Sequence, residues 1–405
     1  MGNTWVFVAV VLALVSVPLA SVALLLVAAL LLVLTLVTRL WARYCLARVQ
    51  YAHSLSAYRA FTGEEVTLTT ELTNGKFLPM PWVQVRDELP RAASPLQGRL
   101  YPAPEQERVI LVSLISLSWY HKVTRRYSLL CQRRGHYYLG PAVVRSGDLF
   151  GMFSRDLRLD RDHILSVYPR VLPLDLARMP SREPYGSVRL RRSLLDDLTR
   201  PMGSREYAPG DSLRHIHWKS TARTGHLQTR VFDASTAPNF VVFFGVRTIE
   251  PPLQGSRPHL LELGVLAATA LVNYALENGH QVGLYVNQTS RLTSKLLQSP
   301  PASDTDQLVR VLEIMAQIHS EETIPLGTLL AERSRSLPWG ATILVVTAVV
   351  DEATSATLAH LRRAGRSVAL VHIGGDAQAA RVGGVPTYVV SDANDWQRME
   401  AVVLT

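Results

Sequence analysis

The residues with the greatest capacity for chemistry lie together in residues 205–233. Asp211, His215, His217 and His226 fall within this stretch. A His-x-His pair on a strand places both imidazoles on one face, as metal sites often do, and the same groups can serve acid–base catalysis. No further ligand stands at a convincing spacing. One hypothesis is therefore a hydrolase or metal-dependent enzyme that uses the cluster of Asp211, His215 and His217.

A structural role explains the same stretch without catalysis. Pro209-Gly210-Asp211 is a turn sequence, and the Asp211 carboxylate can cap the segment after the turn. Ile216 and Trp218 alternate with the two histidines, so both are expected to face a core. Other charged side chains would then form a buried ionic network, because buried charges need partners. The members of this expected clamp are Glu206, Asp211, Arg214, His217, Lys219 and Arg223.

This stretch also carries a resemblance to a known family. The motif runs through Arg205-Glu206-Tyr207, Pro209-Gly210-Asp211, Arg214, Ile216-His217-Trp218-Lys219, Ala222-Arg223 and Gly225. Residues 133–137, 139–141, 148–153 and 167–170 fit the same pattern. Together they resemble domain-of-unknown-function family 58 over nearly the whole chain. The stretch is thus either a structural clamp or an interaction surface of that family.

The apolar N-terminus predicts a membrane anchor. Residues 5–37 are almost wholly apolar, and one helix of that length would measure roughly 50 Å, beyond a hydrocarbon core of about 30 Å. Pro18 lies at the middle of the run. We expect a hairpin of two short transmembrane helices, about 4–17 and 20–38, within residues 1–40. One long kinked helix, and a signal peptide cleaved near Ser21-Val22-Ala23, are the alternatives.

Charge predicts the orientation of this anchor. Arg39, Arg43 and Arg48 come after the second apolar segment, and the positive-inside rule then places the soluble bulk in the cytoplasm, on a bacterial inner membrane. The net charge of +9 across 405 residues suits anionic surfaces, and we expect membrane lipid rather than nucleic acid as the partner. The two cysteines, Cys45 and Cys131, provide no disulfide framework.

Three further segments come after the anchor. Residues 41–175 contain short alternating runs at 66–72, 82–85, 108–118, 126–131, 142–145 and 164–168, with Asn74-Gly75 as a turn pair. This pattern predicts a β-sandwich. Residues 176–237 form a connector in which basic side chains outnumber acidic ones. The connector could contact phospholipid head groups or an acidic partner, or remain a solvated face.

Residues 238–405 alternate between apolar runs of strand length and amphipathic helices. We expect strands at 239–246, 281–286, 341–347, 367–373 and 388–390. We expect helices at 259–278, after a capping Asp304, at 326–335, at 352–364 and at 394–402. Continuous apolar strands between helices predict an α/β fold with a mostly parallel sheet covered on both faces. The family resemblance implies that this is a von Willebrand factor A-like domain.

The residues at the expected ligand-binding edge depart from the metal site that the family resemblance implies. The metal site of such a domain needs an Asp-x-Ser-x-Ser loop after the first strand, with a Thr and an Asp from later loops. Here the first strand continues as Gly245-Val246-Arg247-Thr248, and Asp351 is displaced from the expected acidic position. We therefore expect neither a metal nor another cofactor. The resemblance implies a non-enzymatic scaffold or adaptor that works with a MoxR-type AAA+ ATPase, often beside a transglutaminase-like membrane protein.

Overall fold

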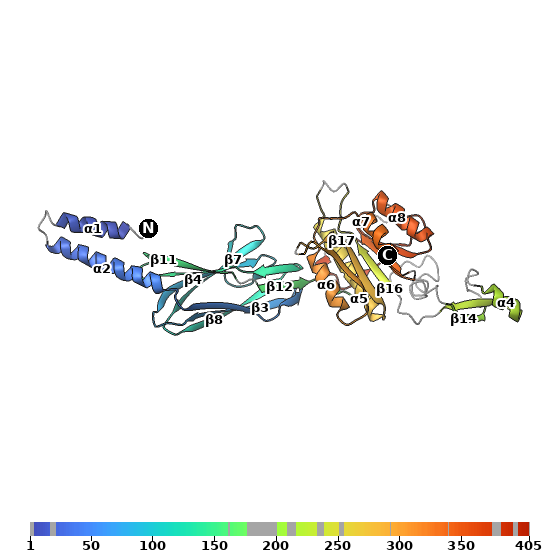
Figure 1. Ribbon diagram of the computed structural model, residues 1–405, viewed down its shortest axis with the longest axis horizontal. Helices are drawn as coiled ribbons and strands as arrows, with labels where there is room; N and C mark the ends of the chain where they lie inside the picture. Colours follow the sequence, from blue (N-terminus) through green and yellow to red (C-terminus); the bar gives the residue numbers. More distant parts are fainter. Residues whose placement is uncertain are drawn as a thin grey trace. The chain divides into compact units, whose positions relative to one another are not determined.

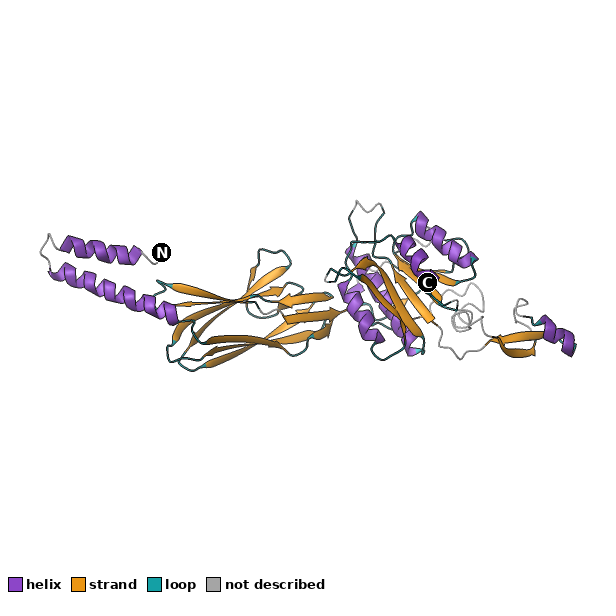
Figure 2. Cartoon of the chain, viewed as in Figure 1, coloured by secondary structure: helices purple, strands orange, loops and turns teal. Residues whose placement is uncertain are grey.

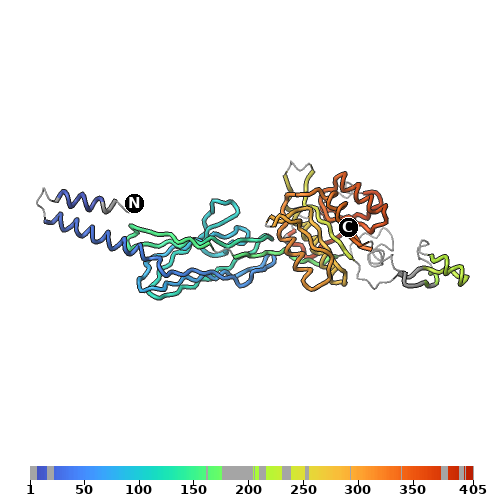
Figure 3. The backbone as a smooth tube through the Cα atoms, in the orientation of Figure 1, coloured from blue at the N-terminus to red at the C-terminus, as the bar shows by residue number. Residues whose placement is uncertain are grey.

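The chain folds into two compact units, residues Met1–Tyr168 and Pro169–Thr405 (Figures 1 and 3). The computed structural model describes residues 4–16, 22–160, 163–175, 201–208, 216–232, 239–250, 255–291, 293–338, 340–374, 382–391 and 396–404. Two expected features, the break at Pro18 and most of the basic connector, lie outside these residues.

Two helices begin the first unit. Helix α1 (Thr4–Ser16) and helix α2 (Val22–Tyr44) lie against each other (Figure 1). Helix α2 is long and apolar enough to cross a membrane, and 17% of its most apolar window is buried. It extends past the predicted end at residue 38, where Thr38 and Ala42 are buried and the helix contacts strands of the β-sheets. Helix α5 (Pro258–Glu277) passes the same test, but 72% of its window is buried, as in a core helix.

The rest of the first unit consists of β-sheets (Figure 2). One sheet has the order β1 (Val49–Leu55), β3 (Glu65–Asn74), β8 (Lys122–Cys131) and β5 (Ala93–Pro95). Another has the order β11 (Ser154–Leu159), β10 (Ala142–Gly147), β4 (Met80–Pro90), β7 (Arg108–Leu117) and β6 (Arg99–Pro102). A third has the order β2 (Arg59–Phe61), β12 (His163–Tyr168) and β9 (Gly135–Leu139).

Alternating burial explains how these sheets hold together. Every second residue of β3 is buried from Val66 to Asn74, as expected for a strand with one face toward a core. Leu68 of the first sheet shares one apolar cluster with Leu89 of the second and Leu165 of the third. A separate cluster joins Leu72 to Val85 and Val144. Side chains of the three sheets therefore share apolar cores.

The second unit is built on a six-stranded sheet. Its order is β18 (Leu296–Ala302), β17 (Gln281–Thr289), β16 (Asn239–Phe244), β19 (Thr342–Thr347), β20 (Ser367–Ile373) and β21 (Thr387–Val390). All pairs are parallel except β17 with β18. The mostly parallel sheet was predicted, but the antiparallel strand β18 was not. Its sequence, with two prolines, lacks a continuous apolar run, and prolines are tolerated because β18 is an edge strand.

Helices cover both faces of this sheet (Figure 1). The strand β16 is apolar after its first residue, Asn239, and its side chains alternate between two cores: Val242 packs with helix α5, and Phe243 packs with the other face. Helix α6 (Gln307–Gln317) joins the first core. Helices α7 (Leu326–Arg333) and α8 (Glu352–Arg363) join the second. A short 3₁₀ turn, η3 (Ser334–Ser336), comes after α7. These α/β elements agree with the prediction.

Two predictions for this unit were wrong. Asp304 does not cap α6, since the N-cap is Asp306 and its side chain makes no capping bond. Asp304 instead pairs with Arg310 one turn into the helix. The expected helix at 394–402 is a 3₁₀ turn, η4 (Trp396–Arg398), followed by β22 (Val402–Val403). Strand β22 pairs in parallel with β13 (Leu174–Asp175), because this pairing buries Val402 and Leu404 in the core.

Candidate functional site

The signature stretch forms a small hairpin with a helix. Strand β14 (Pro201–Glu206) pairs with β15 (Gln228–Phe232), and helix α4 (Trp218–Thr224) lies between them in sequence. The helix begins at His217, whose ring Nδ1 accepts a hydrogen bond from the Ser220 backbone N–H at 3.0 Å. It ends at Gly225, whose φ of 71° is the left-handed conformation that glycine tolerates.

This geometry corrects the expected burial of Trp218. Alternation holds for a strand, but the chain turns into a helix at this residue, so Trp218 does not share the face of Ile216. Ile216 is 5% exposed and bridges Thr229, whereas Trp218 is 68% exposed. Glu206, Lys219 and Arg223 are also exposed. These residues therefore do not form the buried part of an ionic clamp.

The structure gives limited support to a catalytic cluster in the same stretch. The ring Nδ1 of His217 is already used to hold the start of α4, and His226 is exposed. Asp211 and His215, together with Pro209, Gly210 and Arg214, fall outside the described residues. Among the residues that are described, no group of three or more histidines, cysteines, aspartates and glutamates could hold a metal.

A second cluster of polar residues lies at the carboxyl edge of the six-stranded sheet. Arg247 comes after β16, and its guanidinium Nη1 lies 3.4 Å from Asp351 Oδ2 and 3.8 Å from Glu322 Oε1. Asp351 comes after β19, where its other carboxylate oxygen accepts the Thr354 backbone N–H at 2.8 Å and caps helix α8. Residues from three separate connections thus meet at one arginine.

The backbone around Arg247 is closely packed. The Val246 backbone N–H donates to Asn287 Oδ1 at 3.0 Å, and Asn287 Nδ2 donates to Glu322 at 3.2 Å. A Cβ on Gly245 would lie 2.7 Å from Thr347 Oγ1 and 2.8 Å from Leu326, so only glycine fits there. The loop after β16 is therefore fixed by its neighbours.

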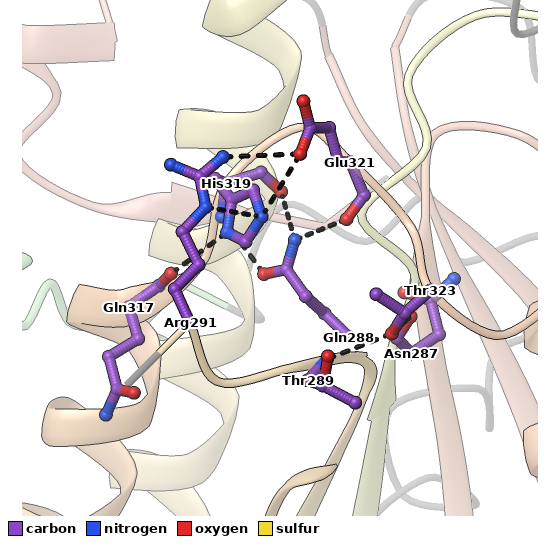
Figure 4. A network of polar contacts seen from close by, with 8 residues as sticks. All are labelled: Asn287, Gln288, Thr289, Arg291, Gln317, His319, Glu321 and Thr323. Carbon is purple, nitrogen blue, oxygen red and sulfur yellow. Dashed lines mark hydrogen bonds and ion pairs between the residues drawn. The ribbon is translucent and has the colours of Figure 1, made fainter. Parts of the chain in front are cut away.

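A network of polar contacts at the end of β17 holds the loop that carries Glu322 (Figure 4). Gln288 is buried, and its side-chain amide nitrogen donates to the backbone oxygens of His319, at 3.0 Å, and of Glu321. The amide oxygen of Gln288 accepts the His319 backbone N–H at 3.1 Å. The Thr323 hydroxyl accepts the Thr289 backbone N–H at 2.9 Å. Residues 319–323 are therefore held beside the strand.

His319 takes part in this network through its ring. Burial is the largest cause that lowers the pKa of His319 from 6.5; Arg291 acts in the same direction, and the Gln317 carbonyl and Glu321 oppose it. A neutral ring can accept a hydrogen bond, and Arg291 Nε donates to His319 Nε2 at 3.1 Å. Arg291 also lies 3.3 Å from the Glu321 carboxylate. The loop thus presents one exposed ion pair and, next in sequence, the more buried pairing of Glu322.

In the sequence, Arg247 and Asp351 stood out only as departures from the expected metal site, and Glu322 and Asn287 were missed. Glu322 comes from a loop without periodicity, and Asn287 lies inside a strand, so neither stood out as a site residue. A signal was present at the end of β17, where the polar run Asn287-Gln288-Thr289 ends an apolar strand. Polar side chains at a carboxyl strand end lie where ligands bind in open α/β sheets.

Comparisons with solved structures give only distant likenesses. A cohesin module from the family 33 glycoside hydrolase of Clostridium perfringens is 13% identical, covers 30% of this chain and 98% of its own, and has a TM-score of 0.21. A non-cellulosomal cohesin from the archaeon Archaeoglobus fulgidus is 9% identical, covers 30% of this chain and 86% of its own, and has a TM-score of 0.19. Likenesses at this level identify neither a fold nor an activity.

Sequence comparisons are more informative. The uncharacterized protein YeaD of Bacillus subtilis is 22% identical over 247 residues, which are 60% of this chain and 57% of YeaD. This chain therefore spans less than two thirds of that relative. The name of YeaD states no activity. Residues 203–395, which include helix α4 and the edge that holds Arg247, match the family described as protein of unknown function DUF58.

Proposed function

We propose that this chain is a membrane-anchored, non-enzymatic scaffold. Helix α2 would hold it in the membrane with its soluble units in the cytoplasm, and its C-terminal unit would be a von Willebrand factor A-like binding module. Three features support this proposal: the apolar length of α2, the mostly parallel sheet with helices on both faces, and the match to an uncharacterised family. The partner we propose is a MoxR-type AAA+ ATPase, with a transglutaminase-like membrane protein as a further component.

The observation that carries the proposal is the position of Arg247. Strand β16 lies at the middle of the sheet, with β17 on one side and β19 on the other. Ligands of open α/β sheets bind outside the carboxyl strand ends at such a switch of direction. Arg247 lies there with Asp351 and Glu322, at the edge where an A-type domain holds its cation.

The arginine can contribute to binding a partner. Its side chain is 21% exposed, and those of Glu322 and Asp351 are 26% and 23% exposed. A guanidinium has five N–H donors. Arg247 Nε is buried and has no partner among the described residues, so the donors open to a partner are on the two terminal nitrogens. The N–H groups there that the two carboxylates do not use can donate to an acidic side chain or a carbonyl group of another protein. The two carboxylates already hold the guanidinium in place, so little side-chain conformational entropy is lost when a partner binds.

The test is the affinity of the detergent-solubilised full chain for a purified MoxR-type ATPase from the same organism. We expect Arg247→Ala to weaken binding about tenfold, which corresponds to about 1.4 kcal/mol. Arg335→Ala is the matched control, because Arg335 is an exposed arginine at η3, away from the carboxyl edge. If Arg247→Ala binds with unchanged affinity while Lys219→Ala or Arg223→Ala binds more weakly, the binding surface lies on helix α4 and not at Arg247. If the wild-type chain does not bind the ATPase, the MoxR-type ATPase is not its partner.

A further inference from the structure

Several large apolar side chains of the first unit are exposed. Phe77 is 72% exposed, Trp119 58%, Tyr120 68%, Leu149 62% and Phe150 64%. Single exposed apolar residues are normal on a protein surface, but a gathered set marks an interaction site. These five residues come from three separate turns, and the position of those turns decides whether they form one surface.

Strand register places the three turns at the same end of the sheets. Val49, the first residue of β1 after α2, lies opposite Asn74, and Thr73 lies opposite Lys122. The turns 75–79 and 118–121 therefore lie at the end where the chain enters from α2. In the other sheet, Met80 pairs with Leu117 and Ser146 pairs with Val83. This brings the turn 148–153 to the same end. We call these three turns the α2 end.

The two turns from β3–β4 and β7–β8 are fastened together. The rings of Phe77 and Trp119 stack with centroids 5.6 Å apart and an interplanar angle of 12°. The Tyr120 backbone N–H donates to Lys76 O at 3.1 Å. Buried Asn74 donates its amide to the carbonyls of Leu78, at 3.0 Å, and Ser118, at 2.9 Å. The exposed rings are thus held outward by a fixed backbone.

The third turn is held outward by Asp148. This aspartate is 1% exposed, and its carboxylate accepts the backbone N–H groups of Phe150, Met152 and Phe153 at 3.0, 3.3 and 2.6 Å. The Trp82 indole donates to the Asp148 carbonyl at 2.9 Å. Leu149 and Phe150 therefore project from a rigid turn. This is the stretch 148–153 that the sequence singled out without assigning it a role.

The three turns of the α2 end lie next to helix α2 and the basic residues near its C-terminus. Helix α2 contacts β10 and β11, the two strands that the turn 148–153 connects. Cys45, just past the helix, is buried, and burial raises the pKa of its thiol, with Lys76 and Arg155 nearby opposing that shift. Arg43 and Arg48 are exposed on the same stretch. The aromatic turns thus lie next to the basic end of the apolar helix.

We propose that the α2 end is a membrane-docking surface whose aromatic and leucine side chains enter the interface of an anionic phospholipid bilayer crossed by α2. Trp and Tyr are favoured at the level of the head groups, and arginines near the surface attract anionic lipid. The surface is continuous with the helix that crosses the membrane, which identifies lipid as its occupant. This inference rests on the membrane anchoring proposed above, and it adds that the first unit lies directly on the bilayer.

The test places a spin label at single introduced cysteines in the full chain, reconstituted in nanodiscs with phosphatidylglycerol. Leu149→Cys and Phe77→Cys probe two separate turns of the α2 end. Tyr58→Cys is the control, since Tyr58 is 50% exposed and lies beyond the other end of β1. Leu30→Cys reports the anchor itself, since Leu30 lies on α2 and is 68% exposed. The native Cys45 and Cys131 are buried, and labelling of the wild type measures their background.

Each label is read by its relaxation with oxygen, which enriches in lipid, and with a water-soluble nickel chelate. We expect labels at 149 and 77 to relax more with oxygen, and the label at 58 to relax more with nickel. Nickel access at 149 and 77, with Leu30 in lipid, would overturn the docking surface and leave the anchor intact. Nickel access at Leu30 as well would remove the anchor. Protection of 149 and 77 from both reagents would indicate a protein contact and also overturn the proposal.

Discussion

Asp87 is a buried carboxyl group in the first unit. It is 4% exposed and accepts the Tyr51 hydroxyl at 2.6 Å, while its Oδ1 has no partner among the described residues. Burial raises the pKa of Asp87 from 3.8 to about 6, and the bond from Tyr51 only partly opposes this. Because the folded pKa lies above the unfolded value, the group favours folding most below pH 3.8, and this contribution is lost as the pH rises through about 6.

We therefore predict that the wild-type chain loses stability between about pH 4 and pH 7, and that Asp87→Asn removes this loss. The full difference corresponds to at most about 3 kcal/mol, since one pKa unit equals about 1.4 kcal/mol. The measurement is chemical denaturation of the solubilised chain across this pH range. Asp160→Asn is the control, because that side chain is 72% exposed. An equal pH dependence in wild type and Asp87→Asn would contradict the prediction.

At the level of single residues, the sequence did not predict the carboxyl-edge cluster; it indicated only that the residues after β16 do not suit a metal site. The absence of acidic and hydroxyl ligands after β16 was visible directly, since Gly245-Val246-Arg247 is local in sequence. Glu322 reaches Arg247 only because Gln288 and Asn287 fix the loop after α6. Such a contact depends on the three-dimensional path of the loop, and no local pattern in the sequence encodes it.

At the level of elements, periodicity predicted helices and parallel strands well but failed where two periods meet. Helix α4 begins at Trp218, two residues after Ile216, so the strand-like alternation of side chains predicted for this segment does not continue across that boundary. His217 marks the change, because its ring caps the helix. The same difficulty applies to residues 394–402, where β22 is specified by its pairing with β13 rather than by its own sequence.

The contrast between Ile216 and Trp218 gives the second prediction. Truncating a buried isoleucine costs about 2–5 kcal/mol, whereas exposed substitutions usually change stability by less than about 0.5 kcal/mol. We expect Ile216→Ala to lower amide-exchange protection across 216–232, and Trp218→Ala to leave it near the wild-type level. Mass spectrometry of exchange in the full chain measures both. Strong loss of protection in Trp218→Ala would show that its ring is buried after all.

At the level of the whole molecule, the proposed membrane anchor means that the first helices would set the side of the membrane on which the two units lie. Helix α1 has 13 residues and spans about 20 Å, while α2 has 23 residues and spans about 35 Å. The apolar part of α2 before Arg39 spans about 25 Å, so α2 comes nearer than α1 to the thickness of a hydrocarbon core of about 30 Å, which would still have to thin slightly. The contact between α1 and α2 supports a hairpin, but a hairpin and a single span place the N-terminus differently.

The last prediction uses this difference. Arg39 and Arg43 lie at the C-terminal end of α2, and Arg48 comes shortly after it. The positive-inside rule predicts that these residues lie in the cytoplasm, and both units with them. A fluorescent protein fused after Thr405 should therefore fluoresce, and a phosphatase that is active only in the periplasm should show no activity there.

The same pair of reporters at the N-terminus should also read as cytoplasmic if α1 and α2 form a membrane hairpin. A periplasmic N-terminus with a cytoplasmic C-terminus would leave α2 as a single span, because only one crossing separates the ends. Periplasmic activity at the C-terminus would overturn the orientation and, with it, the cytoplasmic ATPase as a partner.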